Sequence, residues 1–180
     1  MHVFFIFGNN TDITFIKDFN MITRLSSLYE IPIIDLNTGT QLAEIKDFIL
    51  DIKNEKLIGF ITRNDLFLSF NNTKNLGRDF LSLDCEFSQE IFIDMPQYNH
   101  ENLLLYPRDI LKRPVITEEG KVLGIINDIC LDVFSGSIES YEISDGLFKD
   151  ILKGRAKIFL NQVTSYGNGV IVIKEKDALS

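Results

Sequence analysis

Cysteine, alanine and net positive charge are all scarce in this 180-residue chain, and each shortage excludes a class of protein. The two cysteines, Cys85 and Cys130, form neither a C-x-x-C pair nor any other spacing typical of metal ligands. A secreted chain of this length is expected to carry a disulfide framework, which this chain lacks. The cysteine content therefore favours a cytoplasmic protein with two buried, apolar thiols.

The shortage of positive charge argues against an anionic partner. The net charge is −8 at pH 7, from 18 Lys and Arg against 26 Asp and Glu. A nucleic-acid surface needs clustered cations that displace counterions from phosphates, and an anionic membrane makes a similar demand. The basic residues Lys112, Arg113 and Lys121 are diluted by Glu118 and Glu119. We therefore expect a protein partner or self-association, and no direct binding of nucleic acid.

Long hydrophobic runs are missing as well. The apolar run at the N-terminus, His2 to Phe7, has no basic residues before it and is too short for a signal sequence or a membrane span. We expect a strand there and no transmembrane segment. The chain is nevertheless 45% hydrophobic and 24% charged, as in an ordinary globular protein. Its apolar residues are mainly Ile and Phe, which favour strands over helices.

An internal repeat organises the chain. Residues 33–42 align with residues 115–123, and from Gly39 and Gly120 onward the offset stays at 81, the difference between 120 and 39. At this offset apolar residues match apolar ones and aspartates match aspartates. The matches include Leu42 with Leu123, Asp47 with Asp128, Leu50 with Leu131, Asp51 with Asp132, Leu57 with Ile138 and Phe60 with Tyr141. The chain thus encodes one unit twice.

Each copy has the pattern of short strands separated by turns. Residues 37–39 and 118–120 are expected to form tight hairpin loops whose glycine supplies a positive φ, and residues 53–55 and 135–137 form the second turns. Exposed sheet edges in so small a unit are best removed by curling the sheet closed. We therefore predict a mainly β protein of two tandem small barrels with little helix. This prediction requires two curled sheets, each with its own core, and excludes a single continuous core.

The predicted organisation has four parts. Residues 1–19 form an N-terminal arm or added strand, residues 20–97 the first barrel, residues 98–107 a linker and residues 108–180 the second barrel. The linker is placed where periodicity lapses and Pro, Asn and Gln collect.

Both copies resemble the PRC-barrel family. The resemblance lies in an apolar strand, an acidic or polar Gly turn and a Leu-Gly-x-Val-x-Asp-type strand, as in residues 115–128 of the second copy and 39–47 of the first. The first copy departs from this pattern at Ala43, where Gly is expected, and carries a polar insertion before its last strands. Together the copies cover residues 20 to 175.

The resemblance implies a docking role without catalysis. Relatives include the cytoplasmic domain of the photosynthetic reaction-centre H subunit, the C-terminal domain of a ribosome-maturation factor and small sporulation proteins. A fold does not fix a function, however. We therefore expect a non-enzymatic protein-binding or scaffold module. The alternative is a ribosome- or RNA-maturation factor that docks through a ribosomal protein, and a metal-dependent enzyme is the least favoured reading.

Paired aspartates are the feature most suggestive of chemistry. Asp47 with Asp51, and Asp128 with Asp132, are four residues apart, so on regular strands each pair shares one face and could serve a metal ion or acid–base catalysis. The same pair occurs in both copies beside a turn, where Asp also accepts hydrogen bonds from backbone N–H groups. The interpretation favoured here is turn capping, with no catalytic, metal or cofactor residue assigned.

The remaining candidates have a structural explanation beside the functional one. His2 and His100 have no ligands nearby in sequence, and Cys85, between Asp84 and Glu86, would resist forming a thiolate. The glycines of residues 8–10 and 167–169 match no phosphate-binding loop and read as turns.

Three further segments each allow two structural interpretations. Residues 66–70 are either an interface hot spot or core strand, with core favoured. Residues 149–155 are a helical turn ended by Gly154, or a loop. Residues 103–106 are a strand or the element that joins the two barrels.

Overall fold

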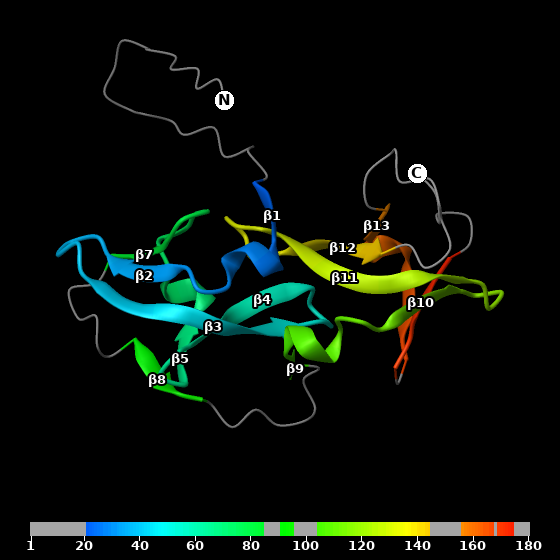
Figure 1. The fold of residues 1–180 in the computed structure, drawn as a ribbon, viewed down its shortest axis with the longest axis horizontal. Helices are drawn as coiled ribbons and strands as arrows, with labels where there is room; N and C mark the ends of the chain where they lie inside the picture. Colours follow the sequence, from blue (N-terminus) through cyan, green and yellow to red (C-terminus); the bar gives the residue numbers. More distant parts are fainter. Residues whose placement is uncertain (1–20, 85–90, 96–103, 145–155, 168, 175–180) are drawn as a thin grey trace, which may run out of the picture.

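The computed structural model describes residues 21–84, 91–95, 104–144, 156–167 and 169–174. These residues form two antiparallel-rich sheets that lie side by side, joined by short 3₁₀ turns (Figure 1). The N-terminal sheet contains β2 (Pro32–Asp35), β3 (Gln41–Asp51), β4 (Lys56–Thr62), β5 (Leu66–Ser69), β6 (Asn75–Leu76), β7 (Leu81–Leu83), β8 (Phe92–Asp94) and β9 (Leu104–Leu105). The C-terminal sheet contains β1 (Ile22–Arg24), β10 (Pro114–Thr117), β11 (Val122–Asp132), β12 (Ile138–Ser144), β13 (Ala156–Phe159), β14 (Val163–Tyr166) and β15 (Ile171–Ile173).

The two sheets share one strand order. Written from the same end, the order is β6-β7-β2-β3-β4-β5 in the first sheet and β14-β15-β10-β11-β12-β13 in the second. The register agrees too, because Phe48 lies opposite Phe60 in the first sheet and Ile129 lies opposite Tyr141 in the second. The prediction of a mainly β protein with two small β units is confirmed. Strand pairing within the described residues leaves both sheets open, so full closure of the barrels is not observed.

Each unit contributes a short strand to the other unit's sheet. β1 precedes the first unit but pairs with β11 of the second, and β9 precedes the second unit but pairs with β3 of the first. In Figure 1, β1 lies beside β11 and β9 lies by the end of β3, and these two crossings form the junction between the units. The segment predicted as a linker, residues 98–107, therefore includes a strand, as the interpretation of residues 103–106 allowed. The predicted arm at residues 1–19 lies outside the described residues.

The second turns of the two units also meet across this junction. Lys56 and Ser137 form an antiparallel bridge. On either side of it, Leu57 N donates to Gly136 O and Ile138 N donates to Glu55 O, each at 2.8 Å. Both bonds join equivalent positions in opposite directions, since residues 55 and 57 correspond to 136 and 138. The chain thus has an approximate internal twofold axis at this bridge, like the symmetric interface of a homodimer.

One apolar core runs through both units. Most buried apolar side chains of both sheets form one contiguous cluster, in which Phe48, Phe60 and Tyr141 are the largest fully buried members. Leu25 and Leu28 of the 3₁₀ turn η1 (Leu25–Leu28) belong to it and are 1% and 0% exposed. The expectation of two separate cores is wrong. The exchanged segments, residues 22–28 and 104–109, carry apolar side chains into the space between the sheets.

The first hairpin turns follow the sequence prediction. Gly39 and Gly120 have φ values of 69° and 85°, in the left-handed region where a β-carbon is unfavourable. Within the part of the chain that the structure describes, no helix is both long and apolar enough to cross a membrane.

Candidate functional site

A group of polar contacts lies at the junction, around two equivalent aspartates. Asp47 and Asp128 lie at β-bulges, where the pairing of β3 with β4 and of β11 with β12 shifts by one residue. In each, Oδ1 accepts the N–H of the following residue, Phe48 or Ile129, at 2.9 Å. The second carboxylate oxygen remains available to bind another part of the chain.

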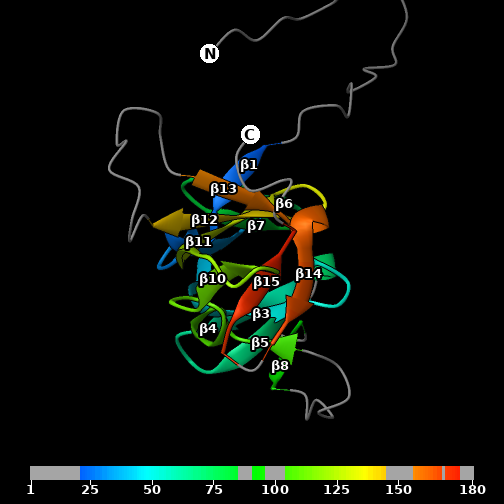
Figure 2. The same cartoon turned by 90° about the vertical axis from the view of Figure 1, so that its right-hand side faces the viewer.

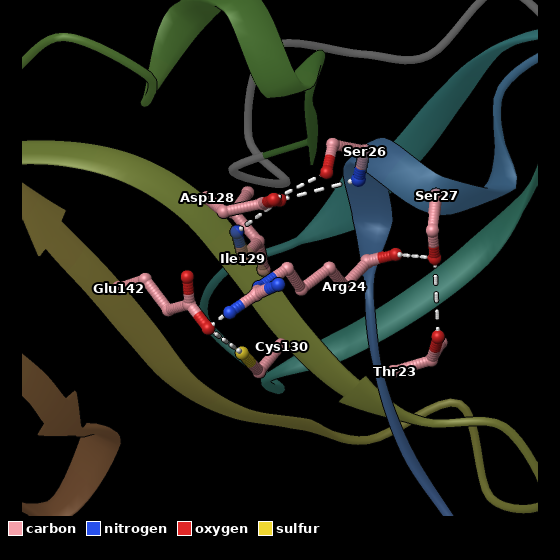
Figure 3. A network of polar contacts seen from close by, with 8 residues as sticks. All are labelled: Thr23, Arg24, Ser26, Ser27, Asp128, Ile129, Cys130 and Glu142. Atoms are coloured by element: carbon pink, nitrogen blue, oxygen red, sulfur yellow. Dashed lines mark hydrogen bonds and ion pairs between the residues drawn. The ribbon is translucent and has the colours of Figure 1, made fainter. Parts of the chain in front are cut away.

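Both aspartates use that oxygen to hold a segment of the other unit. Asp128 Oδ2 accepts the hydroxyl of Ser26, and Oδ1 also accepts Ser26 N at 3.2 Å (Figure 3). Asp47 Oδ2 accepts Arg108 Nη1 at 2.9 Å. Ser26 lies in η1 after β1, and Arg108 lies in η3 (Pro107–Asp109) after β9, so the two contacts are equivalent under the internal twofold. Their role is to dock the exchanged segments.

Beside Asp128, the C-terminal unit holds an ion pair whose carboxylate is buried. Arg24 Nε of β1 donates to Glu142 Oε1 of β12 at 2.7 Å, and the same oxygen accepts the Cys130 thiol at 3.8 Å (Figure 3). The Glu142 side chain is 2% exposed and the Arg24 side chain 51%. The Glu142 carboxylate raises the pKa of Arg24, while burial raises the pKa of the Cys130 thiol. A protonated thiol donating to a carboxylate is no nucleophile.

The N-terminal unit has apolar residues in the same places. At the offset of 81, Ile49 stands where Cys130 does and Ile61 where Glu142 does. Ile49, Ile61 and Phe67 form a small buried cluster, against which Tyr106, Leu104, Ile58 and Met95 pack. Related strands therefore carry a polar patch in one unit and an apolar one in the other.

Tyr29 lies close to both docking aspartates. Its ring packs edge-on against Phe48 with centroids 4.9 Å apart. Burial, followed by the negative charges of Asp47 and Asp128, raises the pKa of Tyr29 to about 12. The phenol therefore stays protonated at neutral pH and acts as a hydrogen-bond donor within the junction.

The other two aspartates cap the second turns. Asp51 Oδ1 accepts Asn54 N at 2.9 Å, and Asp132 Oδ1 accepts both Phe134 N and Ser135 N at 2.8 Å. The predicted turn capping is thus confirmed for these two residues, whereas Asp47 and Asp128 dock segments instead. The described residues hold no group of three or more His, Cys, Asp or Glu arranged to bind a metal ion.

Several sequence candidates fall elsewhere. His2, His100, Cys85 and residues 149–155 lie outside the described residues. In residues 66–70, Phe67 and Leu68 are buried, as the core interpretation expected. The contributions of Arg24, Ser26, Arg108 and Glu142 were missed. The detectable signal was an acidic residue, Glu142, at the position where the N-terminal unit carries the apolar Ile61.

Replacing Arg24 by Met should destabilise the protein by about 2 kcal/mol, because it leaves the buried Glu142 carboxylate without its cation. The expected loss is below that for a fully buried pair, since Arg24 is half exposed and water can partly replace it. Urea unfolding followed by circular dichroism measures the change.

The double variant Arg24→Met with Glu142→Met is the matched control. It places apolar groups at both positions, much as the N-terminal unit does at Ile61, and should recover most of the lost stability. If the double variant were as unstable as the single one, the assignment of the loss to the broken ion pair between Arg24 and Glu142 would be wrong.

Comparison with known proteins gives two findings. The family model described as PRC-barrel domain matches residues 104–179. The chain is also similar to a Bacillus subtilis (strain 168) protein described as "Uncharacterized protein YrrD", with 30% identity over 137 residues that cover 71% of this chain and 72% of the relative.

Proposed function

The chain belongs to the PRC-barrel family, and from this premise we propose that it is a non-enzymatic, cytoplasmic protein-binding module in which two units form one scaffold. One observation carries the proposal. The acidic residues that could have served chemistry, Asp47, Asp51, Asp128, Asp132 and Glu142, all make hydrogen bonds that hold turns or dock exchanged segments.

The surface supports a protein partner. Large apolar side chains remain exposed, among them Phe134 at 59% in the turn between β11 and β12 and Phe159 at 46% in the edge strand β13. Exposed aromatic groups of this kind are the usual anchors of protein interfaces. The net charge of −8 favours a protein over a nucleic acid as the partner.

We further propose that the N-terminal unit is a diverged second copy of the same barrel. The family model matches the C-terminal unit alone. Support for the second copy comes from the identical strand order, the shared register and the reciprocal bonds at the Lys56–Ser137 bridge.

Affinity capture tests the binding function. The full chain, tagged and expressed in its own organism, should retain at least one specific protein that mass spectrometry identifies, or a second copy of itself. Ribosomal proteins as the dominant capture would select the ribosome-docking alternative. A chain that retains nothing and stays monomeric would contradict the proposal.

A further inference from the structure

The outer edge of β13 differs from its counterpart in the first unit. In the N-terminal sheet, β5 pairs on one side with β4 and on the other with β8. In the C-terminal sheet, β13 pairs with β12 and is the last strand of the order; no strand among the described residues pairs with its other side. Figure 2 shows β13 at the margin of the sheet, beside β12.

The registers of β5 and β13 correspond residue by residue. Leu68 lies opposite Phe60, and Ile158 lies opposite Tyr141, which is the equivalent of Phe60. By the same correspondence, Phe67 matches Lys157, and Ser69 matches Phe159. The pairing of β8 with β5 therefore serves as a template for a strand on the edge of β13.

The template defines two positions of that strand. On β5, Phe92 lies opposite Leu68 and packs against the main core, while Ile93 lies opposite Phe67. The equivalent positions on β13 are Ile158, which is buried in the core, and Lys157, which is exposed. A strand on β13 would thus place an apolar side chain opposite Ile158 and an acidic one opposite Lys157.

Beyond Phe159, the edge leads into a shallow, acidic depression. Its volume is about 420 Å³, and its lining combines the apolar Phe159 and Leu160 with the carboxylates of Glu55 and Glu139. Neither Lys nor Arg lines it. A strand antiparallel to β13 would present residues before its apolar position to this depression, where a basic side chain complements the two carboxylates.

A second copy of the chain is a poorer occupant than another protein. Antiparallel pairing of β13 with itself would bring two Lys157 side chains near each other on neighbouring strands, and like charges there are destabilising. An edge lysine is also a common device against edge-to-edge self-association.

We propose that the outer edge of β13 binds an extended segment of a partner protein by strand addition. The segment runs antiparallel to β13, with an apolar residue opposite Ile158, an acidic residue opposite Lys157 and a basic residue two or three positions earlier that reaches Glu55 and Glu139. This surface rests on the proposed binding function and specifies where a partner attaches.

A synthetic peptide of sequence Lys-Ser-Ile-Phe-Glu-Thr, with blocked ends, tests the proposal on the full chain. Titration by isothermal calorimetry should show one site, and hydrogen exchange should slow at residues 156–159 on binding. Lys157→Glu should weaken the peptide about tenfold, because an attractive cross-strand pair becomes repulsive. The peptide with Lys in place of Glu should instead prefer the Lys157→Glu variant.

Arg78→Glu is the matched control, since Arg78 is an exposed cation in the loop between β6 and β7 and should leave affinity unchanged. Equal affinity of wild type and Lys157→Glu would overturn the proposal. So would slow exchange, before peptide is added, at those amides of residues 156–159 that point away from β12, which means that the chain covers its own edge. Self-association that Lys157→Glu abolishes would assign the edge to a second copy and overturn it too.

Affinity capture from lysate distinguishes failure of the β13-edge proposal from failure of the proposed binding function. If wild type and Lys157→Glu retain the same protein equally, the β13 edge is the wrong surface while the binding function stands. If wild type retains nothing, the binding function itself fails.

Discussion

Expressed alone, residues 104–180 are expected not to fold as a stable monomer, although they include the whole region that matches the PRC-barrel model. This half lacks Leu25 and Leu28, which are almost fully buried in the shared core. It also lacks Arg24, the partner of Glu142. Losing the burial of these two leucines alone removes about 3 to 6 kcal/mol of folding free energy, which approaches the whole stability of a typical domain.

Circular dichroism and size-exclusion chromatography would test this. The isolated half should show no cooperative unfolding transition as a monomer, whereas co-expression with residues 21–103 should restore one by supplying β1, η1 and the reciprocal turn. A monomeric fragment that unfolds cooperatively with the stability of the full chain would show that the exchanged segments contribute little to the fold.

Gly124→Ala is expected to destabilise the protein by about 3 kcal/mol. Gly124 has a φ of 155°, and a β-carbon there would lie 2.4 Å from the carbonyl oxygen of Ser144. Gly124 lies beside Ile125 and Ser144, the last pair of the β11–β12 ladder, so this end of β12 would have to move away from β11. In a chain of this size the melting temperature should fall by roughly 6 to 12 °C.

Gly120→Ala separates the two causes. Gly120 also has a positive φ, but nothing lies within 4 Å of the point that a β-carbon would occupy there, so only conformational strain of about 1 kcal/mol is expected. Equal losses for Gly120→Ala and Gly124→Ala would contradict a steric origin.

Gly124 and Ala43 stand at equivalent positions of the two units but differ in backbone conformation. Gly124 lies opposite Val115 of β10, and Ala43 lies opposite Ile33 of β2, each beside a bulge. Gly124 has a φ of 155°, whereas Ala43 is not among the described residues with a positive φ. The backbone of the N-terminal unit is thus compatible with alanine at this position, while that of the C-terminal unit favours glycine.

The candidate site shows where reasoning from sequence stops. Its aspartates were found because Asp47 and Asp128 recur at a fixed offset. The role of these aspartates in docking was not predicted, because Asp128 binds Ser26, 102 residues away. The neighbouring ion pair was missed for the same reason, since Arg24 binds Glu142, 118 residues away. Such contacts are set by the packing of the units, which no local pattern records.

The sequence by itself determined the strands and the turns, and its repeated spacing supports the proposed duplication. These are local properties: alternation of apolar residues selects strands, glycine permits positive φ at residues 39 and 120, and aspartate caps the turns at residues 51 and 132. The tertiary structure alone decided which strand pairs with which. β1 and β9 are only three and two residues long, too short to specify a partner through their own sequence. Their exchange between the units, and the single core that results, depend on apolar surfaces that exist only once both sheets have formed.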